Sequence, residues 1–304
     1  MKRRSRRGTK RRRRTKRGGR GGGRWWRRWR GGGGEEEEKA KKTADADNHF
    51  EKGVRLAERG DKADAVTAFR AAIAADPQHA KAHNNLGFLL SESGDKAGAE
   101  TAYRAAITAD PTHANAHFNL GLVLDERGDT AGAEAAYRTA IAEDSQLAEA
   151  HGSLGILLKQ RGDKAGAEAA YRAAIAEDPT HAMAHINMGN LLSDRGDLAG
   201  AEVAYRAAIA ADSQHAGAHF NLGNLLDERG DKAGAEPAYR AAIAADPQHA
   251  GAHYNLGAVL SERGDLAGAE AAYRAAHEAA TSKEEKSFAK AALDEVQAAL
   301  ESSS

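Results

Sequence analysis

Apolar and polar positions follow one pattern along most of this chain, and the pattern returns every 34 residues. The copy at 80–113 is the clearest. Further copies occupy 114–147, 148–181, 182–215 and 216–249, with more divergent ones at 46–79 and 250–283. Tandem repetition at a period of roughly 20–50 residues is typical of solenoids, in which each copy buries its apolar face against its neighbours. The pattern therefore predicts a repeat architecture of seven copies.

Within each copy, two apolar runs with helical spacing are separated by a Gly-Asp pair. In the copy at 80–113, Gly94 is expected to end the first helix in a left-handed conformation. Asp95 is a good N-cap for the second helix, and Pro111 stops it. Because the loop is short, the helices are expected to be antiparallel neighbours. The expected packed positions are Ala82, Leu86, Leu89 and Leu90 in the first helix and Ala99, Ala102, Tyr103, Ala106 and Ile107 in the second.

The second helix of a copy carries Glu and Arg four residues apart, first as Glu100 and Arg104. Glu on the N-terminal side is the better orientation for an ion pair. The Arg row has two interpretations, a solvated ion-paired face and an anion-binding stripe, and we favour the first. The pair recurs as Glu134/Arg138, Glu168/Arg172, Glu202/Arg206, Glu236/Arg240 and Glu270/Arg274.

The period ends after the last copy, and residues 284–304 predict a single helix that covers the final repeat. Ser282 and Glu285 have the spacing of a capping box. Pro237 stands inside an expected helix where other copies have alanine, and it predicts a local kink. The apolar stripe expected on the last helix consists of Phe288, Ala292, Val296 and Leu300.

The net charge of zero conceals a strong asymmetry. Residues 1–34 contain 17 Lys and Arg and no acidic residue, whereas the remainder contains 27 basic and 44 acidic residues. The basic segment has little to bury, so residues 1–45 are expected to form a disordered arm followed by an acidic and polar linker.

The arm has several interpretations. Its basic runs resemble a nuclear localisation signal or a nucleic-acid patch, and RNA is a candidate partner because Arg neutralises phosphates and Trp stacks on bases. The arm could instead solubilise the protein, fold back on the acidic body, or reflect a misassigned start site. The candidate nucleic-acid-binding residues are Arg11, Arg12, Arg13, Arg14, Arg24, Trp25, Trp26, Arg27, Arg28 and Trp29.

Catalytic and metal chemistry find little support in the sequence. There is no cysteine, and the carboxylates follow the repeat period, so they do not mark a unique acid–base pair. Five His-x-x-x-His spacings, such as His79 and His83, lack a recurring third ligand. We therefore expect neither a metal nor a cofactor and predict a protein that is not an enzyme. No apolar run approaches the roughly 20 residues that span a bilayer, so no membrane partner and a cytoplasmic or nuclear location are expected.

The repeat pattern resembles that of the tetratricopeptide repeat family. In the copy at 80–113 the residues that carry the resemblance are Leu86, Gly87, Leu90, Ala99, Tyr103, Ala106 and Pro111. Ser145, Ser213 and Thr281 replace the closing proline in three copies. Histidine replaces the family's usual Trp at the fourth position. The resemblance implies an all-α fold over 46–283, a right-handed superhelical solenoid of helix-turn-helix repeats plus a capping helix. It also implies a concave groove, lined by the first helices, that binds peptides or extended segments.

The family's groove positions can be transferred to this sequence. They give an apolar and aromatic band and a row of asparagines similar to that in the repeat region of O-linked N-acetylglucosamine transferases. Asparagine is also common there for structural reasons. A chaperone carboxylate clamp is not expected, since only Lys81 and Asn85 match it. The candidate peptide-binding residues are Asn84, Asn85, Phe88, Phe118, Asn119, Leu122, Ile186, Asn187, Asn190, Phe220, Asn221, Asn224, Tyr254 and Asn255.

The sequence thus predicts an interaction scaffold that binds extended protein segments, basic ones in particular because the groove end is acidic. Two alternatives remain: a substrate-recognition region related to that of the glycosyltransferases, and an RNA-binding protein acting through its arm. The sequence names neither the partner nor the oligomeric state.

Overall fold

The computed structural model describes residues 25–303, with side chains described from Glu36 to Ser302. Within this range the chain forms helices and no strand, so the all-α prediction is confirmed. The helices are α1 (Trp25–Glu58), α2 (Lys62–Ala75), α3 (Ala80–Glu92), α4 (Lys96–Ala109), α5 (Ala114–Glu126), α6 (Thr130–Glu143), α7 (Ala148–Gln160), α8 (Lys164–Glu177), α9 (Ala182–Ser193), α10 (Leu198–Ala211), α11 (Ala216–Glu228), α12 (Lys232–Ala245), α13 (Ala250–Glu262), α14 (Leu266–Ala279) and α15 (Lys283–Ser303).

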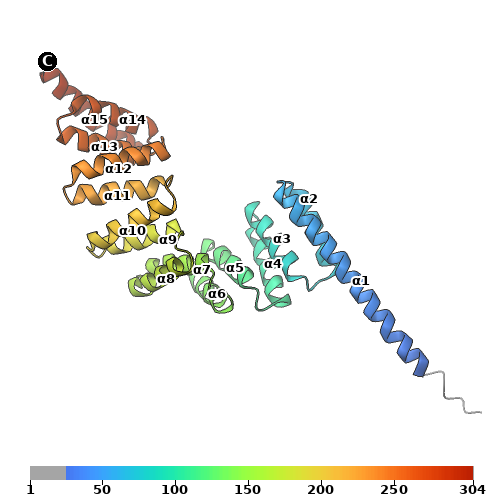
Figure 1. Cartoon of the computed structure of the whole chain (residues 1–304). Helices are drawn as coiled ribbons and strands as arrows, with labels where there is room; N and C mark the ends of the chain where they lie inside the picture. Colours follow the sequence, from blue (N-terminus) through green and yellow to red (C-terminus); the bar gives the residue numbers. More distant parts are fainter. Residues whose placement is uncertain (1–24, 304) are drawn as a thin grey trace, which may run out of the picture. The chain divides into compact units, whose positions relative to one another are not determined.

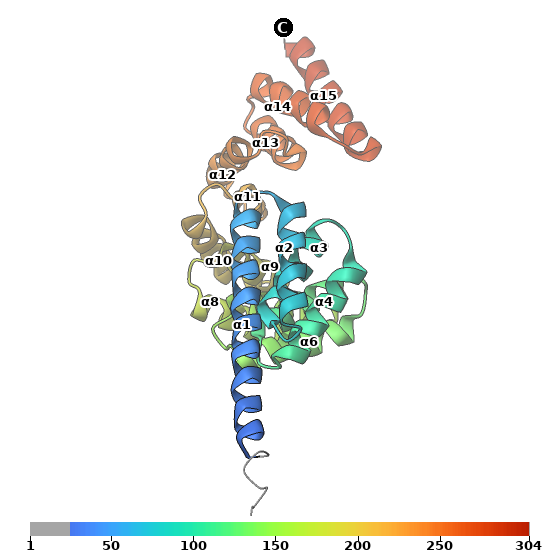
Figure 2. The same cartoon turned by 90° about the vertical axis from the view of Figure 1, so that its right-hand side faces the viewer.

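The helices form hairpins, and the hairpins stack. Contacts divide the chain into two units, one ending at Leu86 and the other beginning at Gly87. In the first unit α1 and α2 lie side by side (Figures 1 and 2). In the second unit each second helix packs on its own first helix and on the first helix of the next repeat, for example α6 on α5 and α7. The second unit is therefore a solenoid, as the period predicts.

The Gly-Asp turn has the predicted geometry in every repeat. The glycines at the hairpin turns have positive φ angles between 78° and 86°. In the copy at 80–113, the Asp95 side chain caps α4 by accepting a hydrogen bond from the Gly98 N–H at 2.9 Å. Asp61 is an exception, since its side chain makes no such bond. Local sequence therefore sets the chain reversal.

In each hairpin an aromatic ring of the second helix packs onto a glycine of the first helix; the ring is Phe69 in the first hairpin and a tyrosine in the others. Tyr239 of α12 is fully buried, and a Cβ atom at Gly223 of α11 would lie only 2.6 Å from its ring. The same contact joins Gly155 with Tyr171 and Gly189 with Tyr205. The glycine at this position of each first helix is thus explained, because only glycine lets the ring approach the helix backbone.

The expected boundary at residue 45 lies within a continuous helix. Ala46 is fully buried, whereas residues 36–45 are exposed. The backbone is helical from Trp25 through the acidic and polar linker into the first repeat. Glu38 and Lys42 form an ion pair one turn apart at 2.9 Å, the kind of local pair that supports an exposed helix. Residues 1–24 of the basic arm lie outside the described range.

The last helix begins with the predicted capping box. The Glu285 N–H donates to Ser282 Oγ at 3.1 Å, and the Ser282 N–H donates to Glu285 Oε2 at 3.2 Å. Three residues of the predicted stripe pack: Val296 is buried, and Ala292 and Leu300 are partly buried against the same core. Phe288 departs from the prediction, since it is 69% exposed, and Ala289 and Leu293 are buried instead. Helix α12 runs through Pro237 without interruption.

Candidate binding surface

The first helices of successive repeats share one face of the second unit. Helices α7, α9, α11 and α13 contact one another in that order. The ninth position of a repeat lies on the first helix, and in three repeats it holds a large apolar side chain that stays accessible. Phe88 is 50% exposed, Leu122 38% and Ile156 37%. We call these three residues the apolar row.

A small pocket lies between Phe88 and Leu122. Its volume is about 160 Å³, and α3, α4 and α5 contribute to its lining. Asn119 is part of this lining, together with two carboxylate residues, Glu92 and Glu126. Tyr103 also lines the pocket, and burial together with the Glu92 charge raises the pKa of Tyr103 to about 12. The pocket therefore combines an apolar wall with carboxylates, of which Glu126 is paired with Lys96 at 3.0 Å.

The asparagines of the later repeats are engaged with one another. Asn190 Oδ1 accepts hydrogen bonds from the Tyr205 hydroxyl at 2.8 Å and from Asn221 Nδ2 at 3.0 Å. Asn224 Oδ1 accepts in the same way from Tyr239 at 2.9 Å and from Asn255 at 2.8 Å. A carbonyl oxygen has two lone pairs, so both are used here. These asparagines join neighbouring repeats, which is the structural reading that the sequence left open.

The other predicted asparagines lie elsewhere. Asn84 and Asn85 belong to the first unit, where Asn84 Nδ2 donates to Asn85 Oδ1 at 3.3 Å. Asn187 is half-buried on α9.

Residues at the fifth position of a repeat pack mainly between helices. Ile186 is only 5% exposed and packs against Ala208 and Ala218, so burial removes it from the surface. Phe118 is half-buried, with its ring centroid 5.9 Å from that of Tyr137. Phe220 stacks on His249 at 4.5 Å, and Tyr254 meets Tyr273 edge-on at 5.3 Å. These rings are therefore only partly exposed.

The histidines have structural roles that their spacing did not reveal. Nδ1 of His113 accepts from the Ala116 N–H at 3.3 Å and so caps α5. Nε2 of His117 donates to the Pro111 carbonyl at 2.9 Å. Both bonds recur along the chain, and no cluster of potential metal ligands occurs among the described residues.

The outer Glu/Arg pairs exist as predicted and also reach the next repeat. Glu100 pairs with Arg104 of its own helix at 2.9 Å and with Arg127 of the following repeat. Hydrogen bonds from Arg195 and Arg172 lower the pKa of Glu168, the corresponding residue two repeats later. The second arginine could not be predicted from helical spacing, because it lies 27 positions away in the sequence. The ion-paired interpretation of this face is confirmed, since these arginines pair with glutamates.

The predicted nucleic-acid-binding residues lie outside the part of the chain whose side chains the structure describes. Arg11, Arg12, Arg13, Arg14 and Arg24 lie outside the described range, and Trp25 to Trp29 belong to the part of α1 whose side chains are not described. Within the described residues, no helix is long and apolar enough to cross a membrane.

Comparison with known proteins gives a consistent family match. A family model described as tetratricopeptide repeat matches residues 50–114, 89–148, 118–182, 153–216, 186–250 and 220–284. No curated protein matches. Several solved structures share the fold. A tetratricopeptide repeat protein from Parabacteroides merdae is 19% identical, with a TM-score of 0.58 over 84% of this chain and 99% of its own.

Two further structures show the same fold. PilF from Pseudomonas aeruginosa is 20% identical, with a TM-score of 0.63, over 73% of this chain and 99% of its own. YrrB, described as having an unusual peptide-binding site, is 23% identical with a TM-score of 0.50, over 61% of this chain and 95% of its own.

Proposed function

Because this chain belongs to the tetratricopeptide repeat family, we propose that it acts as a protein-interaction scaffold and that its apolar row binds an extended segment of a partner protein. The observation that carries the proposal is the exposure of Phe88, Leu122 and Ile156 on neighbouring repeats. Large apolar side chains that remain exposed together are typical of interaction sites. The core is built from the next residue in the sequence of each repeat, since Leu89, Val123 and Leu157 are buried.

The regular spacing of the row suits a segment that presents side chains at intervals. One residue of the row comes from each repeat, so an extended peptide crossing the first helices would meet an apolar contact at every step. The pocket between Phe88 and Leu122 would take one anchoring side chain. A few buried apolar anchors usually dominate the free energy of such an interface.

The proposed partner is basic as well as apolar. Glu92 and Glu126 line the pocket, and Asp125 lies beside them in the sequence. The chain beyond residue 34 carries 44 acidic and 27 basic residues. Electrostatic complementarity of this kind raises association rates and selects partners by charge.

The test begins with peptides selected from a random displayed library against the whole protein. We expect selected sequences to combine apolar residues with Lys or Arg. Binding of one such peptide is then measured by fluorescence anisotropy to a variant carrying Phe88→Ser, Leu122→Ser and Ile156→Ser. We expect affinity to fall at least about tenfold, which corresponds to about 1.4 kcal/mol.

Val203→Ser is the matched control, because Val203 is 70% exposed on a second helix outside the row. It should bind the peptide as the wild type does. Equal binding by the row variant and the control would refute the proposed site. Circular dichroism of all variants checks that the helices are intact.

A further inference from the structure

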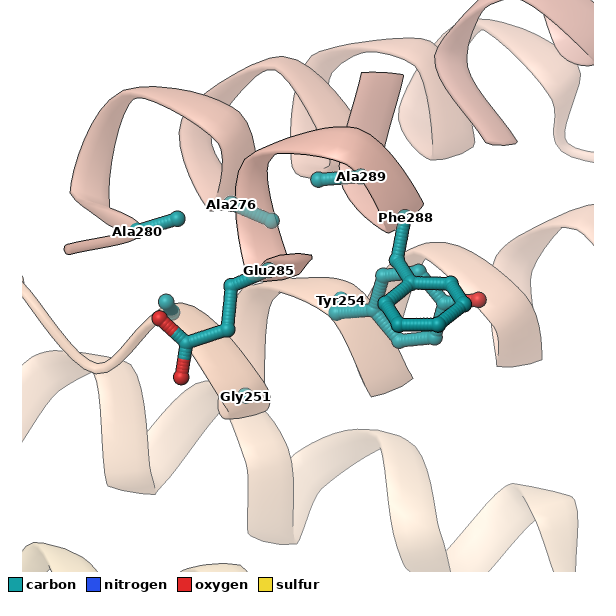
Figure 3. Close-up of a pocket in the computed structure, with 8 residues that line it drawn as sticks. Gly251, Tyr254, Ala276, Ala280, Glu285, Phe288 and Ala289 are labelled. Atoms are coloured by element: carbon teal, nitrogen blue, oxygen red, sulfur yellow. The ribbon is translucent and has the colours of Figure 1, made fainter. Parts of the chain in front are cut away.

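A second pocket lies at the other end of the second unit, between α13, α14 and α15. Its volume is about 380 Å³, within the range of roughly 300–1,000 Å³ that is typical of ligand sites. Tyr254 and Phe288 place their rings on one side of it, and the Glu285 side chain projects on the other (Figure 3). The rest of the lining is small: Ala250, Gly251, Ala276, Ala280 and Ala289.

In two other repeats a histidine ring lies against the aromatic residue that corresponds to Tyr254. His79 lies 4.9 Å from Phe50, and His249 lies 4.5 Å from Phe220, measured between ring centroids. In the last repeat the residue at the closing position is Lys283, which is exposed, and α14 ends in alanines. Tyr254 therefore has no histidine ring beside it and lines the pocket instead.

Two of the other repeats indicate what the pocket would accept. There a planar, nitrogen-bearing imidazole lies against the aromatic ring at the fifth position, at interplanar angles of 35° and 41°. Here the pocket adds a carboxylate, and backbone N–H groups of Thr281 and Ser282 hold Glu285 Oε2 at 3.2 Å each. These bonds lower the pKa of Glu285, so the carboxylate is negatively charged at neutral pH.

Phe288 has no evident role in the fold. It is 69% exposed, while Ala289, Leu293 and Val296 make the contacts that hold α15 in place. An exposed phenylalanine beside a fixed carboxylate is a suitable arrangement for a cation with a flat face.

We propose that this pocket binds an arginine side chain from a basic segment of a partner protein. A guanidinium group is planar and always charged, and it can stack on the rings while donating hydrogen bonds to Glu285. Lysine fits the site less well because its ammonium group is compact and strongly hydrated. The acidic excess of the chain beyond residue 34 favours a basic segment. The proposal shares a basic partner with the proposed function, but it concerns different residues.

The test uses the full-length protein and two fluorescent octapeptides, one alternating Arg with Gly and the other alternating Lys with Gly. Both carry the same charge, so a difference between them reports the guanidinium and not general attraction. We expect the wild type to bind the Arg peptide about fivefold more tightly, which corresponds to about 1 kcal/mol of cation–π attraction.

Phe288→Ala and Glu285→Gln should each abolish the preference for Arg. Both variants should fold, because Phe288 is exposed and Gln also completes a capping box. Glu284→Gln is the matched control: it changes the net charge equally, one residue away, and Glu284 does not line the pocket.

Equal binding of the two peptides by the wild type would overturn the proposal, as would an unchanged Arg preference in Phe288→Ala. The variant that lacks the apolar row should keep the Arg preference. Loss of the preference there, with Phe288→Ala unaffected, would assign arginine recognition to the row instead and refute this pocket.

Discussion

Substituting Gly223 with alanine tests whether the glycine beneath each aromatic ring is a packing requirement. A Cβ atom at this position would lie 2.6 Å from Cε1 and 2.7 Å from Cδ1 of Tyr239. Tyr239 is fully buried, so its ring has no room to move away. Alanine in the middle of a helix normally stabilises by about 0.5–1 kcal/mol relative to glycine. Overpacking of a core costs about 1–3 kcal/mol, so we expect a net loss of stability.

Gly152 is the matched control within a first helix. A Cβ atom there would meet only the His181 ring, at 3.5 Å from Nε2, which is an ordinary contact. Gly152→Ala should therefore stabilise by about 0.5–1 kcal/mol. Gly230→Ala tests the backbone conformation alone. No atom would lie within 4 Å of a Cβ atom at Gly230, but its φ angle is 78°. The left-handed conformation alone should then cost about 1–2 kcal/mol.

Urea unfolding followed by far-UV circular dichroism measures the three variants against the wild type. Midpoints are compared, because long repeat arrays need not unfold in a two-state transition. We expect the urea midpoint of Gly152→Ala to lie above that of the wild type. The midpoints of Gly223→Ala and Gly230→Ala should lie below it. A Gly223→Ala protein as stable as the Gly152→Ala protein would show that the tyrosine contact does not require glycine.

Three further predictions follow from the repeat contacts. Leu147 is the N-cap of α7 and makes no side-chain capping bond. Leu147→His should therefore raise the urea midpoint, because a restored cap stabilises by up to about 1 kcal/mol. An unchanged midpoint would argue against a capping role for the histidines. Glu134 pairs with Arg138 and Arg161, so Glu134→Gln should lower stability by about 0.5–1.5 kcal/mol, and less at high salt. Glu143→Gln on the same helix is its control. Equal losses of stability in both variants would contradict a stabilising role for the Glu134 ion pairs. Burial raises the pKa of several tyrosines to about 12, so the folded chain keeps protons that the unfolded chain releases near pH 10, and stability should fall as pH rises from about 10 to 12. Tyrosinate absorbance should then appear together with loss of helix, whereas titration near pH 10 with helix intact would refute the argument. These tyrosines are Tyr103, Tyr171, Tyr205, Tyr239 and Tyr273.

Local rules predicted the helices and their ends well. Gly94 and Asp95 behave as the sequence indicates, because a left-handed residue and an N-cap depend on bonds within a few positions. The capping box at Ser282 is another local case. The start of the first helix is a different case. Residues 36–45 precede the first repeat and are helical, although their side chains are exposed.

The residues that repeat position selects for the groove have different environments in the structure. Phe88 and Leu122 are exposed. Repeat position also selected Ile186, which neighbouring helices bury, and Asn190 and Asn224, whose carbonyl oxygens are used between repeats. Period alone does not distinguish these cases, because equivalent positions have different neighbours in each copy.

The sequence by itself determined the seven-fold repetition, the hairpin turns and the family, because helix periodicity and capping are short-range properties. The tertiary structure decided which equivalent side chains remain exposed. It brought Arg127 to Glu100 and left Tyr254 facing a pocket instead of a histidine. The reason is physical: contacts between stacked repeats depend on how neighbouring helices approach, and a change of one side chain in the next copy fills or empties the space.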